Sequence, residues 1–172
     1  ADLEGAIYAV TTLISRRPLL AAAALALALL PAAALAQSTG EPQPKLPTEP
    51  LTIETAEGPL TFEVEMATTP MQQSRGLMFR DEVPPLTGML FVHSPPRPIS
   101  MWMRNTPTSL DMLFINEEGV IAGIAARTTP FSEAVISSPG PMAGVLEILG
   151  GEAERLGISA GDNVDHPFFA AD

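Results

Sequence analysis

Hydrophobic and polar residues alternate in several short runs of this chain, which is the pattern of strands with one buried face. Two such runs, 51–53 and 60–66, flank Glu57-Gly58-Pro59 and predict a β-hairpin. A continuous apolar run at 88–92 predicts a strand buried on both faces. Further strands are expected at 99–104, 110–115, 120–126, 145–149 and 163–166. The pattern therefore predicts a mostly β structure.

Helical signals are few and short. Thr68-Thr69-Pro70 offers a capping hydroxyl and a proline suited to a first helical turn, so a helix is expected from about residue 70 to 78. Gly76 is unfavourable inside a helix and indicates close packing against another backbone. A second short helix is expected at 150–156, where Gly157 suits the position after its end. Residues 94–98 predict a rigid loop, and 127–141 a long surface loop with a short strand at 134–136.

The N-terminal part has the pattern of an export signal. Arg16-Arg17 precedes a long Ala/Leu run, and Ala34-Leu35-Ala36 resembles a cleavage site, so residues 1–36 are interpreted as a signal peptide. An uncleaved membrane anchor is the alternative, but Pro31 within the run and the A-x-A ending favour cleavage. The sequence thus predicts a periplasmic or secreted protein that is free of the membrane after cleavage.

Proline-rich composition marks the segment that follows. Residues 37–50 hold four prolines among mostly polar residues and predict an extended, unpacked linker. A single folded domain is then expected at 51–169, which is long enough to bury a normal core.

Charge and cysteine content exclude several classes of function. The net charge is −11, and all of it lies after residue 36, so binding to nucleic acid or anionic lipid is disfavoured. The chain contains no cysteine, which rules out disulfides, thiolate metal sites and cysteine nucleophiles within it.

The segment from Met101 to Ile115 concentrates unusual residues. Alternation places Met101 and Met103 on one face of a strand and Trp102 on the other. Asp111 lies inside an apolar strand, where an unpartnered carboxylate would be unfavourable. Two roles are open for it: bonding to the 105–108 loop or to an arginine, or facing a ligand pocket.

Several short motifs, in a fixed order, resemble the domain-of-unknown-function family 192 (DUF192). They are RGLMFR at 75–80, GMLF at 88–91, WMRNT at 102–106, LDM at 110–112, VLE at 145–147, GI at 157–158 and GD at 161–162. The resemblance covers about residues 51–168. The chain departs from it at Met101, where an aromatic residue is usual, and at Ser109, where proline is usual.

This resemblance implies an α+β fold that is mostly β. The expected architecture is a compact, barrel-like mixed or antiparallel sheet with one or two short helices, often behind a signal peptide. The resemblance supplies no activity and implies no cofactor.

Three classes of function are consistent with these residues. A non-catalytic binding module of the cell envelope is favoured, with a small molecule or an envelope protein as partner. Its site would combine an aromatic wall, a cation, an amide and acids: Arg75, Trp102, Asn105, Asp111 and Glu147. The structural alternative is a buried pair of Arg75 and Asp111 that fixes the helix on the sheet.

Two further functions are less favoured by the same pattern. Met101 and Met103, with His93 nearby, could bind Cu(I) or Ag(I), since thioethers suit soft cations, although methionine more often fills core gaps. A hydrolase-type enzyme could use Asp111 and Glu147 as an acid/base pair. No phosphate loop or nucleophile elbow accompanies them, so the sequence leans against an enzyme.

Overall fold

The computed structural model describes residues 40–169. The predicted signal peptide, 1–36, and the first residues of the predicted linker lie outside the described residues. Within the described part, no helix combines the length and apolar character needed to cross a bilayer.

Seven strands form one sheet, in the order β5-β4-β6-β3-β2-β1-β7. The strands are β1 (Thr48–Thr55), β2 (Gly58–Ala67), β3 (Thr87–Met101), β4 (Leu110–Ile115), β5 (Ile121–Ala125), β6 (Ile136–Leu149) and β7 (Asn163–Asp165). All neighbours are antiparallel except β2 and β3, which are parallel because α1 (Pro70–Arg75) and a loop connect them. The mostly β, mixed-sheet fold that the sequence predicts is confirmed.

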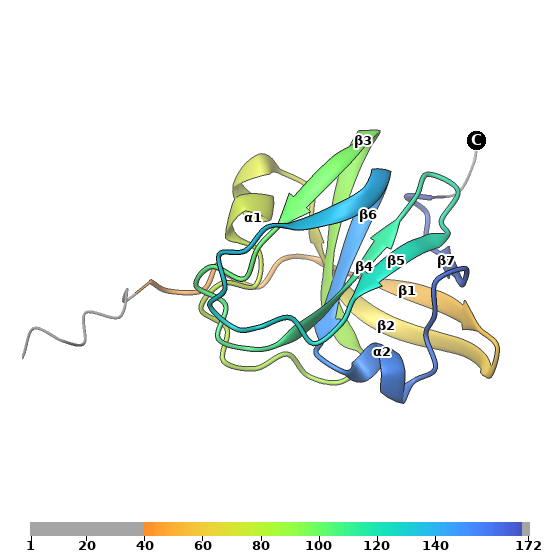
Figure 1. The fold of residues 1–172 in the computed structure, drawn as a ribbon, viewed down its shortest axis with the longest axis horizontal. Helices are drawn as coiled ribbons and strands as arrows, with labels where there is room; N and C mark the ends of the chain where they lie inside the picture. The colour runs from red at the N-terminus through yellow and green to blue at the C-terminus, as the bar shows by residue number, and fades with distance from the viewer. Residues whose placement is uncertain (1–39, 170–172) are drawn as a thin grey trace, which may run out of the picture. The chain divides into compact units, whose positions relative to one another are not determined.

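The sheet curls so that its two edge strands approach each other (Figure 1). A bridge between Val120 and Asn163 connects the start of β5 to β7, and Val164 donates a backbone hydrogen bond to Gly119. The main core lies inside this curl and draws large apolar side chains from all seven strands, among them Phe62, Leu90 and Leu146. The barrel-like shape thus follows from burying one face of every strand.

A second apolar core covers the opposite face of β3, β4 and β6. It contains Met89, Phe91, Met112 and Val145 from these strands, together with Leu77 from the segment that follows α1. Figure 1 shows α1 beside β3 on this side of the sheet. Because both faces of the central strands are buried, β4 is buried along its whole length and is apolar except for Asp111.

The two predicted helices are present but shorter than expected. The Thr69 side chain caps α1 by accepting a hydrogen bond from the Gln72 backbone N–H. The Gln72 side-chain oxygen in turn accepts a hydrogen bond from the Thr69 backbone N–H. The second helix, α2, is Glu152–Arg155, and Gly157 follows it with a left-handed φ of 72°. The predicted positions of both helices are therefore confirmed.

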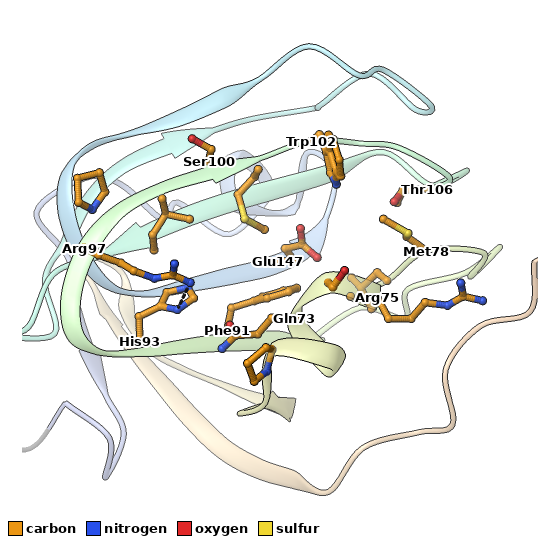
Figure 2. Close-up of a pocket in the computed structure, with 17 residues that line it drawn as sticks. Gln73, Arg75, Met78, Phe91, His93, Arg97, Ser100, Trp102, Thr106 and Glu147 are labelled. Carbon is orange, nitrogen blue, oxygen red and sulfur yellow. Dashed lines mark hydrogen bonds between the residues drawn. The ribbon is translucent and has the colours of Figure 1, made fainter.

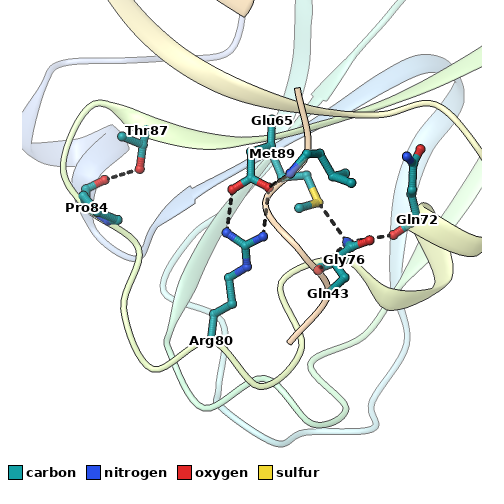
Figure 3. A network of polar contacts seen from close by, with 9 residues as sticks. Gln43, Glu65, Gln72, Gly76, Arg80, Pro84, Thr87 and Met89 are labelled. Carbon is teal, nitrogen blue, oxygen red and sulfur yellow. Dashed lines mark hydrogen bonds and ion pairs between the residues drawn. The ribbon is translucent and has the colours of Figure 1, made fainter. Parts of the chain in front are cut away.

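The linker prediction is wrong for its second half, because residues 43–50 pack against the domain. β1 begins at Thr48, and Pro47 accepts a hydrogen bond from the Met66 backbone. Gln43 donates to the carbonyl oxygen of Gly76 at 2.9 Å, and Leu46 donates to Glu65, which also pairs with Arg80 (Figure 3). Composition predicts an extended chain here, and the chain is extended, but its polar groups have partners.

Two strands are also much longer than predicted. The expected rigid loop at 94–98 lies within β3, where shifts in register accommodate its prolines. β6 begins at Ile136, so the surface loop expected at 127–141 ends at residue 135. The long parts of β3 and β6 pair with each other and extend beyond β2 (Figure 1). This extension forms one wall of the pocket described next.

Candidate ligand pocket

A pocket lies between the α1 region and the extended part of β3. Its volume is about 520 Å³, and it opens to solvent. Apolar walls come from Phe91, Ile99, Met101, Trp102 and Met78, and polar groups are contributed by Gln73, His93, Arg97 and Glu147 (Figure 2). Apolar walls with a few polar groups are the usual composition of a small-molecule site.

Glu147 projects from β6 into the middle of this lining (Figure 2). Its residue partners on the two neighbouring strands are Met89 on β3 and Met112 on β4, both fully buried. Glu147 is 4% exposed, and its carboxyl group forms no hydrogen bond or ion pair with another side chain or backbone group of residues 40–169. Burial raises the pKa of Glu147 to about 8. At neutral pH its carboxyl group is therefore mainly protonated and can donate a hydrogen bond.

His93 and Arg97 lie together on β3 at another part of the lining. An Nη atom of Arg97 is 3.2 Å from Nδ1 of His93, and a guanidinium can only donate, so Nδ1 accepts. Burial, with the charge of Arg97, lowers the pKa of His93, which keeps the imidazole neutral. The remaining proton is then on Nε2, which leaves that atom as a donor.

The α1 side of the pocket is held in place by backbone contacts. Gln73 donates to the carbonyl oxygens of Ala67 and Val92, which ties α1 to the ends of β2 and to β3. Gly76 follows the helix with a φ of 49°, and a Cβ there would lie 3.1 Å from the Phe91 ring. The close approach indicated by Gly76 is thus to an aromatic side chain rather than to another backbone.

Two of the predicted ligand-binding residues line the pocket besides Glu147. Trp102 is 46% exposed and forms part of the mouth. Arg75 also borders the pocket, but its side chain runs away from Glu147 in Figure 2, and its guanidinium lies 4.4 Å from the centre of the Phe79 ring. The structure therefore brings together Arg75, Trp102 and Glu147, although only the last two face the cavity with their side chains.

Asp111 lies outside the pocket lining, and its partners are backbone N–H groups. It is fully buried and accepts backbone hydrogen bonds from Arg127 at 2.7 Å, Gly151 at 2.8 Å and Ala153 at 2.9 Å. The prediction that Asp111 bonds to the 105–108 loop or to Arg75 is wrong. The three amides come instead from the segment after β5 and from the start of α2. A carboxylate with three amide donors needs no arginine.

Asn105 also lies outside the pocket lining. It has a left-handed φ of 57°, and its carbonyl oxygen accepts from the Phe79 backbone at 2.8 Å. Its side-chain amide approaches the sulfur of Met78 at 3.9 Å. Its contacts therefore shape the loop that carries Met78 and Phe79.

The acid/base pair of Asp111 and Glu147 is not formed. On the paired strands, Asp111 lies opposite Ile148, and Glu147 lies opposite Met112. Since successive side chains alternate between the faces of a sheet, the two carboxyl groups point to opposite faces. The hydrolase hypothesis is therefore wrong in the form that uses this pair.

The three residues of the soft-metal hypothesis are also not assembled. His93 and Met101 line the pocket, whereas Met103 is 1% exposed in the second core, and its sulfur accepts from Thr128. β3 ends at Met101, so the strand alternation that would align the two methionines does not continue. Among the described residues, no group of three or more histidine, aspartate or glutamate side chains is arranged to hold a metal.

Sequence reasoning missed Gln73, Phe91 and Arg97 as pocket residues. The sequence pattern places Arg97 in a rigid loop, because four of its neighbours are proline or serine. Phe91 belongs to an apolar run in which the sequence does not distinguish a pocket residue from a core residue. The only available signal was His93, four residues before Arg97, which alternation places on the same face as Phe91.

Comparisons with known proteins agree with this fold. The family model DUF192, described as "Uncharacterized ACR", matches residues 52–166. No curated protein matches the chain.

Two solved structures are similar to most of the described domain. One is a "putative transcription regulator" from Sinorhizobium meliloti 1021, with 42% identity and a TM-score of 0.69, covering 72% of this chain and 96% of that one. The other is a protein of unknown function from Novosphingobium aromaticivorans DSM 12444, with 40% identity and a TM-score of 0.70, covering 73% of this chain and 90% of that one. These similarities support the fold and leave the activity open.

Proposed function

The chain belongs to the DUF192 family of uncharacterized domains. We propose that it is a non-catalytic binding module that holds a small molecule in the pocket between α1 and β3. The observation that carries this proposal is Glu147, a buried carboxyl group directed into an open cavity of about 520 Å³. A buried polar group without a protein partner lowers stability, so its presence favours a role toward a ligand.

The proposal extends to the place where the module works. The leader pattern at 1–36 supports export, so we propose that the domain acts in the periplasm or outside the cell. Its acidic charge disfavours nucleic acid and anionic lipid as partners.

Native mass spectrometry of the exported protein, purified from its own cells, tests this function. The expected result is a reproducible adduct on the wild-type chain. Ser74→Phe places a large ring on an exposed position of α1 that borders the pocket, and it should remove the adduct. Ser159→Phe adds the same ring at an exposed position outside the pocket lining and should keep it. A bare wild-type mass, or an adduct that Ser74→Phe leaves unchanged, would contradict the proposal.

A protein partner is a second candidate, favoured by exposed aromatic side chains near the pocket mouth. Phe131 is 63% exposed, and its backbone bonds to Thr106, which lines the pocket beside the half-exposed Trp102. Exposed aromatic residues are frequent centres of binding surfaces. Cross-linking in intact cells should then capture one partner in the wild type and lose it in Phe131→Ser, while Val135→Ser serves as the exposed apolar control.

A further inference from the structure

Two arginines border the pocket, although the chain as a whole carries a net charge of −11. Arg75 comes from α1, and His93 and Arg97 come from β3; β6 contributes Glu147, the only acidic residue of the lining. β4, which packs beside Glu147, presents Met112 and adds no charge there. Arg97 is therefore a positive charge at the pocket of an otherwise acidic chain, because the guanidinium of Arg75 lies against Phe79 and His93 is neutral.

Arg97 has no acidic partner among residues 40–169. Its side chain donates a hydrogen bond to Nδ1 of His93, and none of the ion pairs in the described part involves it. The bond leaves other guanidinium donors of Arg97 unused, and it fixes the imidazole so that Nε2–H is a further donor. A cation and a neutral donor that are in contact on one strand suit an oxyanion, which accepts several hydrogen bonds at once.

Glu147 provides a second polar contact of the same kind. A protonated carboxyl group donates a hydrogen bond through its O–H, and it lacks the negative charge that would attract an ammonium group. The positive charge of Arg97 also opposes a positively charged ligand. The pocket thus offers hydrogen-bond donors from His93 and Arg97 at one side and from Glu147 near its middle, with Phe91 and Trp102 as apolar surface.

We propose that the ligand is a small organic anion whose carboxylate or phosphate group binds Arg97 and His93, whose apolar body lies against Phe91 and Trp102, and which accepts a hydrogen bond from Glu147. This inference rests on the proposed small-molecule function and adds the charge and orientation of the ligand. The cavity volume fits a molecule of one or two rings rather than a polymer.

Trp102 is the only tryptophan of the chain and borders the pocket, so its fluorescence reports occupancy. Four probes of similar size separate the alternatives: benzoate, phenyl phosphate, benzyl alcohol and benzylamine. The chain beginning at Gln37 is titrated with each at pH 6.5 and constant ionic strength. Benzoate or phenyl phosphate should bind at least about tenfold more tightly than the alcohol, and the amine more weakly than the alcohol. The preferred anion tells a carboxylate ligand from a phosphate ligand.

Three variants test the assigned contacts. Arg97→Gln should weaken the preferred anion about tenfold or more and leave benzyl alcohol unchanged, whereas Arg97→Lys should restore part of the affinity. Arg127→Gln removes an arginine that lies outside the pocket in an exposed pair with Glu154, and it should have no effect. Glu147→Gln retains a donor and should bind the anion, while Glu147→Leu should not. Circular dichroism and the Tm of each variant establish that it is folded.

The outcomes separate this inference from the function on which it rests. Equal binding of all probes, a preference for benzylamine, or an Arg97→Gln variant that binds the anion as well as the wild type would overturn the anionic ligand and leave small-molecule binding in place. If no probe changes Trp102 fluorescence while Ser74→Phe still removes a native adduct, the anionic class is wrong. If no adduct exists either, both proposals fail.

Discussion

Two carboxyl groups on neighbouring strands show, at the scale of single residues, how the surroundings decide a role. Asp111 and Glu147 are both buried, both lie within apolar runs, and are indistinguishable by sequence pattern. Asp111 accepts three backbone hydrogen bonds, which give its carboxyl oxygens partners within the fold. Glu147 meets two methionines and a cavity, which favour the neutral acid.

The first prediction concerns the pH dependence of stability that Glu147 causes. Its pKa rises from 4.5 to about 8 on folding, so the folded state holds the proton more tightly. This contribution is fully present below pH 4.5 and is lost as the pH rises through 8. Glu147→Gln cannot ionise, so it should be more stable than the wild type above pH 8, by at most on the order of 5 kcal/mol, since pocket water reduces the effect.

Urea unfolding of both chains at several pH values between 4 and 9 measures this difference. The gap between Glu147→Gln and the wild type should widen with pH and then level off. The exposed substitution Glu117→Gln is the matched control and should follow the wild type. A gap that does not change with pH would show that Glu147 titrates normally.

The second prediction concerns Asp111. Asp111→Ala leaves three buried backbone donors without an acceptor and should lower the free energy of unfolding by about 2–4 kcal/mol. Asp165→Ala, at an exposed position of β7, should change it by less than about 0.5 kcal/mol. Chemical denaturation measures both. Retention of probe binding by the weakened but folded Asp111→Ala variant would agree with a position outside the pocket, and a selective loss of binding would argue against it.

At the scale of elements, the α1 region forms one side of the pocket, and its contacts with β2 and β3 fix that side in place. α1 is only six residues long, so its position depends on its capping box and on the two bonds from Gln73. The turn that ends it requires Gly76, whose backbone lies in a region that other residues rarely adopt. The segment therefore has little freedom to move away from Phe91 without breaking these contacts.

Gly76→Ala tests this dependence. The variant places a Cβ at a φ of 49° and 3.1 Å from the Phe91 ring, so it should lower stability by about 1–3 kcal/mol. It should also weaken any probe bound in the pocket, because Gly76 belongs to the lining. Gly140→Ala is the control, since its backbone has no left-handed φ and a Cβ there meets nothing within 4 Å. Equal Tm values for the two variants would contradict this account.

At the scale of the whole molecule, the segment before β1 belongs to the folded domain. A chain that begins at Leu51 lacks the first three residues of β1 and the contacts of Gln43 and Leu46. It should be less stable than a chain beginning at Gly40 by about 2–4 kcal/mol, at about 0.5–1.5 kcal/mol for each lost hydrogen bond. Thermal unfolding of the two chains measures the difference. Equal stability would restore the interpretation of this segment as an unpacked linker.

The export proposal also belongs to the whole molecule. If the leader is cleaved after Ala36, the protein recovered from the cell envelope should begin at Gln37, and its intact mass should lack residues 1–36. Substituting the cleavage-site pair, Ala34→Leu with Ala36→Leu, should leave the leader attached. Full-length protein found in the cytoplasmic fraction of wild-type cells would contradict export.

The amino-acid sequence determined the features that depend on local chemistry. Alternation predicted the strands of the β1–β2 hairpin, and Thr69-Pro70 predicted the start of α1, because strands and caps depend on neighbouring residues. The ordered motifs indicated the family, and hence the curled sheet. The segments at 43–50 and 94–98 were misread, because proline-rich composition shows an extended chain but not whether distant groups pair with it.

Only the tertiary structure decided the pocket. Glu147 and Asp111 differ by the face of the sheet on which each lies, and that face depends on strand pairing across about 35 residues of sequence. Arg97 meets His93 at the pocket because β3 continues through its prolines, and Asp111 meets its amides because α2 begins beside it. Long-range pairing fixed these neighbours, and the neighbours set the chemistry of each group.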